Sequence, residues 1–352
     1  MQVDYLIIGQ GICGTMLSWY LHREGKTVLV MDDKKENSAS RVAAGLINPV
    51  TGRRYSYSWR IEEIMPFAEQ SYRELETAFD TKLIYARSII DFFPSPDTRL
   101  AFADRMSEND TYLSSFPDQN HFNQYFNFDF GCGEIRPAYS VHLPLLLDLW
   151  RKKLQDMNAL REEIFYSDKL VIHKDHVAYD GIVAEKLIFC EGVSGNSNPW
   201  FTLLPFAVSK GEAVIIEAPE LTNEHIFKRG SLMVPLPEPG YFWIGSNYLW
   251  EFEDEHPTEK FRNQVTMLLN KWLKKPYKIV DHKASVRPGT LERRPFVGLH
   301  PVYDVIGICN GMGTKGTSLA PFFAYEFAQH LIHGFPITPE ADVKRFTRIL
   351  SK

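Results

Sequence analysis

The chain has 352 residues, of which 44% are hydrophobic and 24% are charged, and its formal net charge is −5. This length suffices for two domains with sizeable cores, and the composition excludes a disordered, collagenous or coiled-coil protein. Acidic and basic residues are interspersed, so we expect no broad basic face of the kind that binds DNA or RNA.

The four cysteines are far apart in the sequence and form no C-x-x-C motif; they are Cys13, Cys132, Cys190 and Cys309. This spacing argues against a metal site and against a disulfide framework. The first residues lack the basic segment of a signal peptide, and no apolar run reaches the ~18 residues of a membrane-spanning helix. We therefore expect a soluble cytoplasmic protein with no metal and no membrane span.

The N-terminal segment predicts a strand, a glycine-rich turn, a helix and a second strand. Residues 5–8 form a short apolar run that is typical of a strand buried on both faces. Residues 9–14 fit the pattern G-x-G-x-x-G, and the apolar positions of residues 16–21 share one face of a helix. A second apolar run, residues 27–31, ends at two acidic residues.

This arrangement is expected to bind the ADP part of a dinucleotide. Gly9 permits the tight turn, Gly11 lets the backbone approach a pyrophosphate, and Gly14 lets the helix pack close to the strand. The N–H groups at the start of the helix, around Ile12 and Cys13, face the phosphates.

Two acids follow the second strand, Asp32 and Asp33. Asp32 has the better spacing to accept both ribose hydroxyls, and Asp33 is the alternative. An acid at this position favours FAD or NAD over NADP, because it repels a 2′-phosphate.

Two further segments favour FAD over NAD. Residues 38–49 follow the second strand directly and are unusually apolar for a surface loop. Residues 305–309 predict a buried strand that runs into a glycine-rich segment, 310–321, and then into a helix. This second strand-to-helix turn indicates that the C-terminal part of the chain returns to the cofactor, which a two-domain NAD dehydrogenase does not require.

These segments resemble the D-amino-acid oxidase superfamily of FAD-dependent amine oxidases, and glycine oxidase and sarcosine oxidase above all. The matching stretches are residues 9–14, 40–46, 186–192, 208–212, 287–290, 295–301 and 311–321. The resemblance implies an α/β fold: a doubly wound, Rossmann-like βαβ domain for FAD, with an inserted, mostly antiparallel β-sheet substrate domain. We assign 1–80, 138–202 and 281–352 to the FAD domain, and 81–137 and 203–280 to the substrate domain.

The resemblance also implies which residues contact the cofactor. Noncovalent FAD is expected, because Arg287 and Pro288 stand where some sarcosine oxidases carry the attaching cysteine. The N–H groups of residues 313–317 would stabilise the reduced flavin, with the Lys315 side chain either assisting or merely solvated. Beyond the opening motif, the implied contacts are Ser40, Arg41, Ala43, Ala44, Gly45, Leu46, Val171, Gly192, Gly311, Gly313, Thr314, Lys315, Gly316 and Thr317.

The substrate residues are less clearly marked. Arg287 matches the arginine that holds a substrate carboxylate in D-amino-acid oxidases, but it could instead pair with Glu292. Leu232 and Thr314 depart from the family, since they stand where relatives carry a tyrosine and an arginine. The residues left to line the pocket are Tyr248, Trp250 and the cluster Arg53, Arg54, Tyr55 and Tyr57, each of which has a structural or solvated alternative.

We therefore expect an FAD-dependent oxidoreductase that oxidises the C–N bond of a small amine or amino acid, with Arg287 and Tyr248 as candidate catalytic residues. The alternatives are a flavoenzyme that acts on a carboxymethylaminomethyl group of modified tRNA, an FAD-binding protein without amino-acid oxidase activity, and an NAD-dependent dehydrogenase. O2 as electron acceptor and a homo-oligomer are left open by the sequence.

Overall fold

The computed structural model describes residues 1–108 and 111–351. Contacts divide the chain into two units. Unit 1 contains Met1–Arg41, Leu143–Ser209 and Val286–Lys352, and unit 2 contains Val42–His142 and Lys210–Ser285.

These boundaries differ from the expected ones by a few residues at 138–142, 203–209 and 281–285, and by a whole segment at residues 42–80, which falls in unit 2. The reason is strand pairing: β3 (Leu46–Ile47) adds to the unit 2 sheet by pairing antiparallel with β8 (Cys132–Val141). The Glu76 carboxylate then accepts hydrogen bonds from the backbone N–H groups of Leu83 and Ile84, at 2.8 and 2.9 Å. These bonds tie the end of α3 (Ile61–Phe79) to the start of β6 (Ile84–Phe92).

The sheet of unit 1 is built around a set of parallel strands. β1 (Gln2–Ile8) lies between β2 (Val28–Met31) and β12 (Ile182–Phe189), and β12 also pairs with β19 (Ile306–Asn310). The apolar runs read from the sequence form these strands and are buried, as parallel strands covered on both faces must be. The remaining strands, as far as the described residues go, are β9 (Leu160–Arg161), β10 (Leu170–Ile172), β11 (Val177–Tyr179) and β18 (Phe296–Leu299).

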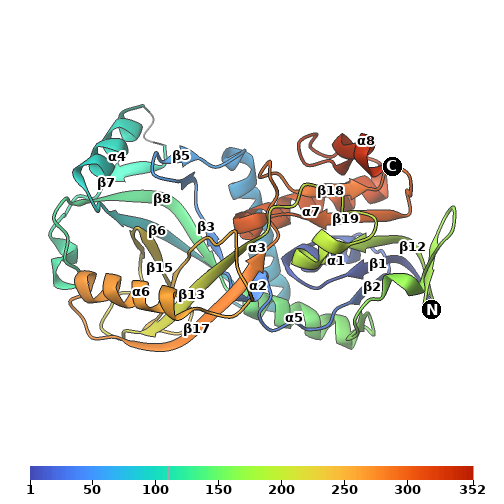
Figure 1. The fold of residues 1–352 in the computed structure, drawn as a ribbon, viewed down its shortest axis with the longest axis horizontal. Coiled ribbons are helices and arrows are strands. Elements are labelled where there is room, and N and C mark those ends of the chain that lie inside the picture. The colour runs from blue at the N-terminus through green and yellow to red at the C-terminus, as the bar shows by residue number, and fades with distance from the viewer. Residues whose placement is uncertain (109–110, 352) are drawn as a thin grey trace. The chain divides into compact units, whose positions relative to one another are not determined.

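The helices of unit 1 pack on this sheet and on one another (Figure 1). α1 (Ile12–Arg23) contacts both α5 (Leu143–Asp156) and α7 (Gly316–His333). The carboxyl ends of the parallel strands meet at one edge, which is where open α/β sheets bind ligands. Shorter elements are α2 (Ala39–Val42), α8 (Thr347–Leu350), η2 (Ser167–Lys169), η3 (Gly192–Ser197), η4 (Gly313–Lys315) and η5 (Val343–Phe346).

Unit 2 is a mostly antiparallel sheet, which confirms the expected fold class. Among the described residues its strand order is β17-β13-β16-β15-β14-β6-β8-β3, with β7 beside β8 and β14 parallel to β6. The bounds are β6 (Ile84–Phe92), β7 (Leu113–Ser115), β13 (Ser209–Glu217), β14 (Ile226–Arg229), β15 (Ser231–Pro235), β16 (Tyr241–Gly245) and β17 (Lys278–Arg287); β4 (Val50–Thr51) and β5 (Ser56–Tyr57) form a separate hairpin.

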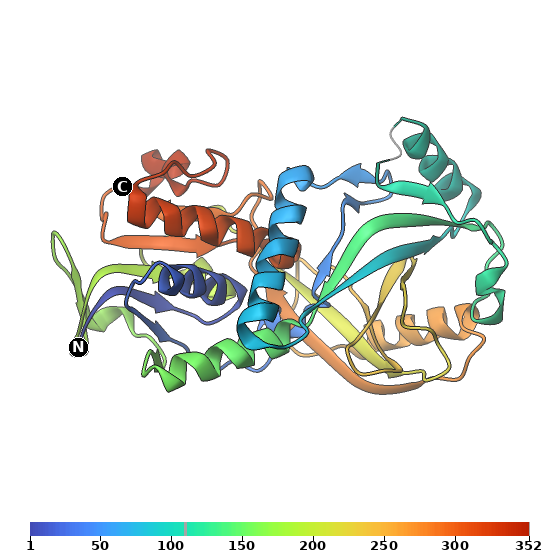
Figure 2. The same ribbon diagram turned by 180° about the vertical axis from the view of Figure 1, so that it is seen from behind.

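The helices of unit 2 include α3 (Ile61–Phe79), α4 (Pro96–Glu108) and α6 (Glu259–Trp272), with the short η1 (His121–Gln124) (Figure 2). The apolar residues of α3 and α6 recur with helical spacing, so each helix buries one face. Thr258 caps α6 by accepting the N–H of Phe261. In the part of the chain that is described, each helix is too short or too polar to cross a lipid bilayer.

Candidate dinucleotide site

Two of the three motif glycines are required by the protein itself. Gly9 has φ +97°, and a Cβ there would lie 2.5 Å from the carbonyl oxygen of Cys190. A Cβ on Gly14 would lie 1.9 Å from the carbonyl oxygen of Gly9. The main chains of β1, α1 and the end of β12 therefore approach one another so closely at the carboxyl edge of the sheet that a side chain does not fit at Gly9 or Gly14.

Gly11 has no such requirement. Its φ is −71°, which any residue can adopt, and a Cβ would meet only the Ser40 hydroxyl, at 3.3 Å. The backbone of Gly11 therefore faces space that the described residues leave open, so the site fits a group that must approach the main chain closely. The N–H of Ile12, at the start of α1, donates to Ser40 Oγ at 3.0 Å.

The two acids after β2 differ in their surroundings. Asp32 is partly buried, and its Oδ2 accepts the backbone N–H of Gln10 at 2.8 Å, inside the glycine-rich turn. Asp33 is exposed. Asp32 is therefore fixed to the glycine-rich turn, whereas Asp33 is open to solvent.

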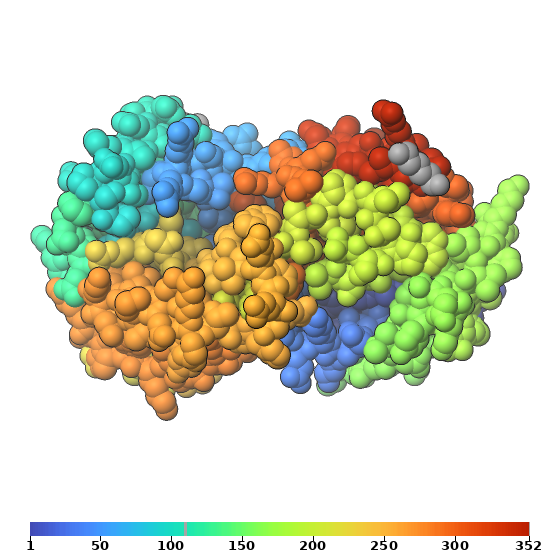
Figure 3. Space-filling view, viewed as in Figure 1, coloured from blue at the N-terminus to red at the C-terminus, as the bar shows by residue number. Residues whose placement is uncertain are grey.

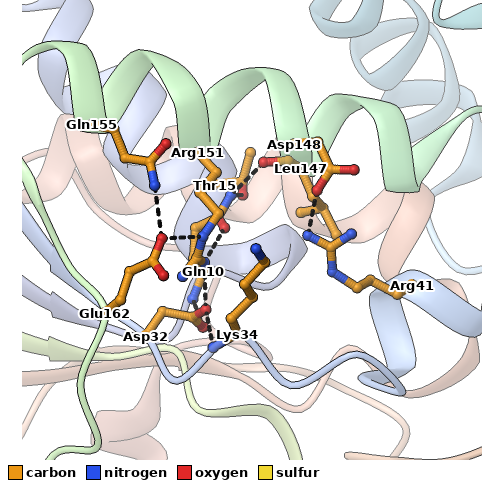
Figure 4. A network of polar contacts seen from close by, with 10 residues as sticks. All are labelled: Gln10, Thr15, Asp32, Lys34, Arg41, Leu147, Asp148, Arg151, Gln155 and Glu162. Atoms are coloured by element: carbon orange, nitrogen blue, oxygen red, sulfur yellow. Dashed lines mark hydrogen bonds and ion pairs between the residues drawn. The ribbon is translucent and has the colours of Figure 1, made fainter.

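Sequence reasoning missed the residues that surround Asp32. Arg151 of α5 is 4% exposed and donates from Nη1 to Asp32 Oδ1 at 2.7 Å (Figure 4). Gln10 fills a position of the motif that the pattern leaves free, and its Oε1 accepts from Arg151 Nη1 at 3.1 Å. The polar side chain of Gln10 inside an otherwise apolar turn could have indicated a polar contact there. No neighbouring residue in the sequence indicated that Arg151 is its partner.

The loop after β2 is shared between the two units. Arg41 pairs with Asp148 of α5 at 2.6 Å, within unit 1. Ala43, Ala44, Gly45 and Leu46 belong to unit 2. Gly45 has φ +68°, and its Cβ would lie 1.9 Å from the carbonyl oxygen of Val141, so the close approach to β8 requires this glycine whether or not a cofactor is bound.

The second glycine-rich turn also lies at the strand ends of unit 1. Gly192 follows β12 and Gly311 follows β19, with φ +59° and +79°. Asn310 joins them, because its Nδ2 donates to the Gly192 carbonyl at 2.8 Å and its Oδ1 accepts the Gly311 N–H. Gly313, with φ +56°, donates its N–H to the Pro288 carbonyl at 3.1 Å, so this donor is already used.

The start of α7 lies beside the start of α1. A Cβ on Gly316 would lie 3.5 Å from Ile12 Cγ2. Thr314 is exposed and Thr317 is buried. The backbone N–H groups in the first turn of α7 are not bonded within the helix, as at the start of any α-helix. Burial lowers the pKa of Lys315 to about 8, because desolvation penalises its charged form.

Val171 is 52% exposed on β10, so its side chain is open to solvent or ligand within unit 1.

Arg287 is the last residue of β17 and is half-buried. Glu292, the acid that was its possible partner, pairs instead with Arg345 at 3.3 Å.

In unit 2, Tyr248 and Trp250 are 51% and 63% exposed, so neither is a core residue. Figure 3 shows the face of the molecule on which the part of the chain that follows β16, coloured orange, lies at the surface. Paired backbone hydrogen bonds between Lys210 and Leu249, at 2.9 and 3.0 Å, fix the segment to β13.

The cluster of residues 53–57 does not act as one surface. Arg53 and Arg54 are exposed, whereas Tyr55 is 1% exposed and donates to Asp91 Oδ2 at 2.9 Å. Tyr55 is therefore a buried structural residue of unit 2. The Tyr57 hydroxyl is buried and has no hydrogen-bond partner among the described residues.

Three cysteines distant in sequence meet beneath the turn of unit 1. The Cys309 thiol interacts with those of Cys13 and Cys190, and all are buried and free. Hydrogen bonding to Cys309 and burial raise the pKa of the Cys13 thiol well above its usual value, which makes it unreactive. Within residues 1–108 and 111–351, no group of three or more His, Cys, Asp or Glu is arranged to hold a metal ion.

Glu191 is a further residue that sequence reasoning missed. It lies between β12 and Gly192, and a Cβ on Gly9 would approach its Cα to 3.3 Å. Burial raises the pKa of its carboxyl group to about 7, against a hydrogen bond from Asn198 that lowers it.

The family described as FAD dependent oxidoreductase (DAO) matches residues 4–330 of this chain. Glycine oxidase from Geobacillus kaustophilus is 17% identical over 97% of this chain and 98% of that chain, with a TM-score of 0.78. Iminodiacetate oxidase from a Chelativorans species is 16% identical over 95% and 96%, with a TM-score of 0.76. L-Proline dehydrogenase from P. horikoshii is 14% identical over 99% and 98%, also with a TM-score of 0.76. The resemblance found in the sequence is thereby confirmed.

Proposed function

The chain belongs to the DAO family of FAD-dependent oxidoreductases, and on this basis we propose that it oxidises the C–N bond of a small amine or amino acid. The observation that carries the proposal is the glycine-rich turn of residues 9–14 in unit 1, where the backbone of Gly11 faces open space and Asp32 is fixed to the same turn. When bound, FAD accepts the hydride equivalent from the carbon next to the substrate nitrogen.

The residues that would hold the cofactor come from both glycine-rich turns. We assign the pyrophosphate to the backbone around Gly11 and Ile12, and the ribose to Asp32. Noncovalent binding is supported by the cysteines, because all four are buried. Residues 43–46 are assigned to the same cofactor through the family resemblance.

Charge on the reduced cofactor is assigned to the start of α7. The N–H groups of its first turn and the positive end of the helix dipole favour negative charge there. We add one side chain to these backbone N–H groups, that of Lys315. Its pKa of about 8 means that it still carries a proton at neutral pH, so its positive charge can stabilise the negative charge of the reduced cofactor.

Arg287 is our candidate for the substrate carboxylate, because a guanidinium fork matches a carboxylate with two hydrogen bonds. Its half-buried position supports this role. Tyr248 remains a candidate contact on unit 2. Leu232 and Thr314 replace two residues that relatives use for their substrates, which favours an amine other than glycine or a simple D-amino acid.

Anaerobic reduction tests the proposal. FAD-loaded protein is mixed with glycine, N-methylglycine, iminodiacetate, L-proline, D-alanine and a carboxymethylaminomethyl nucleoside, and loss of the oxidised flavin spectrum is followed. We expect one or more free amines to bleach the flavin. Bleaching by the modified nucleoside alone would favour the tRNA-modifying alternative, and bleaching by none would favour an FAD-binding protein without this activity.

Two further properties are part of the proposal. We propose O2 as the electron acceptor, which is tested by re-oxidation and peroxide formation after air is admitted to the reduced protein. We also propose a cytoplasmic location, which agrees with cysteines that remain free. Fractionation of the source cells tests the location.

A further inference from the structure

Arg151 is a buried cation whose hydrogen bonds are directed at the turn of unit 1 (Figure 4). It is 4% exposed, and its Nη1 donates to Asp32 Oδ1 at 2.7 Å while its Nε donates to Glu162 Oε1 at 3.2 Å. Its Nη2 is buried and has no hydrogen-bond partner among the described residues. The charge therefore depends on Asp32 and Glu162, since a buried charge needs paired and hydrogen-bonded neighbours.

Gln10 fixes the guanidinium from a second side. Its amide nitrogen donates to the Leu147 carbonyl at 2.9 Å and to Thr15 Oγ1 at 3.2 Å, which orients its Oε1 toward Arg151 Nη1, 3.1 Å away. The turn, α1 and α5 are thus joined by one polar network. Arg151 cannot shift without breaking bonds to two chain segments.

The Asp32 carboxylate is nearly saturated by this network. Oδ1 accepts from Arg151 and from the N–H of Lys34 at 2.9 Å, and Oδ2 accepts from the N–H of Gln10 at 2.8 Å. A carboxylate has about four acceptor directions. Three are therefore used inside the protein, and the remaining one belongs to Oδ2.

We propose that Arg151 is a positioning residue that orients Asp32 so that it accepts one ribose hydroxyl of the cofactor, and not both. The inference rests on the proposed FAD site and changes the expectation that the acid would bind the two hydroxyls together. With Oδ1 held by Arg151, only Oδ2 is presented to the nucleotide. A preoriented acceptor binds its donor without first losing rotational freedom, so Arg151 raises affinity without touching the ligand.

The test measures binding of ADP, 2′-deoxy-ADP and 3′-deoxy-ADP to flavin-stripped full-length protein by calorimetry. Relative to the wild type, we expect Asp32→Ala to reduce the affinity for ADP about tenfold or more, as loss of a hydrogen bond to a charged acceptor does. The same substitution should leave the affinity for one of the two deoxy nucleotides unchanged, since that analogue lacks the hydroxyl that Asp32 binds. Asp33→Ala, which changes an exposed neighbour, is the control and should alter none of the three.

Arg151→Met should weaken ADP binding and reduce the preference of ADP over that same deoxy nucleotide, because Asp32 is then free to rotate. Arg151→Lys should restore part of the preference, since an ammonium gives one donor but not the planar fork. Arg345→Met is the matched control, because Arg345 pairs with Glu292 elsewhere in unit 1 and its loss should lower stability while the preference persists. If Arg151→Met is insoluble, Arg151→Lys is judged instead by the ratio of its affinities for ADP and for that deoxy nucleotide.

Two results would overturn the inference. One is that Asp32→Ala weakens the binding of both deoxy nucleotides, which would mean that the carboxylate binds both hydroxyls. The other is that Arg151→Met prefers ADP over that deoxy nucleotide as strongly as the wild type does. If the wild-type protein binds neither ADP nor FAD, the proposed function fails instead, so the two failures are distinguished.

Discussion

Asn198 Nδ2 donates a hydrogen bond to Glu191 Oε2 at 2.8 Å, directly after the strand that flanks the Gly9 turn. This bond only partly offsets the burial of the Glu191 carboxyl group, whose pKa is raised to about 7. The proton is therefore held more tightly in the folded than in the unfolded protein. Stability from this group is complete below pH 4.5, the ordinary pKa, and is lost as the pH rises through about 7.

Glu191→Gln should remove this loss, because the amide keeps the Asn198 hydrogen bond and carries no charge. The stability gained by the variant over the wild type should grow between pH 4.5 and 7, reaching roughly 3 kcal/mol at most. Urea unfolding of both proteins at acidic and at mildly alkaline pH measures this difference. A constant difference across the range would mean that Glu191 titrates normally.

Gly11→Ala tests the open face of the turn. Among the described residues the new Cβ would meet only Ser40 Oγ, at 3.3 Å, so we expect little change in the melting temperature of the flavin-free protein. FAD affinity should fall by about tenfold or more, or ~1.4 kcal/mol, because the methyl group lies where the backbone must approach the cofactor. Calorimetric titration with FAD gives the affinity.

Gly14→Ala is the matched control. Its Cβ would lie 1.9 Å from the Gly9 carbonyl oxygen, so this variant should be destabilised even without FAD. Full FAD affinity in Gly11→Ala would show that the cofactor does not approach this backbone.

Arg287→Ala should separate substrates by charge. If the guanidinium binds a carboxylate, kcat/KM for an amino-acid substrate should fall roughly 100-fold, which is ~2.7 kcal/mol. An amine of the same size without a carboxylate should be affected much less. Arg287→Lys should recover part of the loss.

Arg294→Ala is the comparison for Arg287, since the Arg294 guanidinium donates to the backbone carbonyl of Arg293. It should leave kcat/KM unchanged. An equal loss for both substrate types in Arg287→Ala would point to a structural role for Arg287.

Tyr55→Phe tests the reassignment of Tyr55 to the core of unit 2. Asp91 is 1% exposed and is held by Lys228 at 2.6 Å as well as by Tyr55. Loss of the Tyr55 hydroxyl should lower stability by about 1.5–3 kcal/mol, with kcat unchanged. Denaturant unfolding and steady-state kinetics measure the two effects.

Tyr57→Phe provides an internal control for Tyr55. Its hydroxyl has no hydrogen-bond partner within the described part of the chain, so its removal should be neutral or slightly stabilising. A reduced kcat in Tyr55→Phe with normal stability would return Tyr55 to the substrate contacts.

Local patterns predicted the elements that carry the site. The apolar runs, the glycine spacing and Asp32 sufficed for β1, α1 and β2, because each signal lies within a few residues of the structure it determines. The same holds for α3 and α6, whose apolar faces repeat with the helical period.

Features that depend on distant partners could not be read in this way. Arg151 and Asp32 are 119 residues apart, and an arginine in a predicted helix is ordinarily solvated. Tyr55 looked like part of an exposed basic and aromatic cluster because its partner, Asp91, lies in another strand. The contact units differ from our domain assignment at residues 42–80 for the same reason, since the pairing of β3 with β8 places this segment in unit 2.

The most direct test of a flavin site in unit 1 is the visible spectrum of the purified full-length protein, recorded before and after addition of FAD. We predict the absorption bands of bound oxidised flavin, release of unmodified FAD by acid, and a clearly lower FAD content in Gly11→Ala at an FAD concentration that just saturates the wild type. A colourless wild-type protein that takes up no added FAD would contradict it.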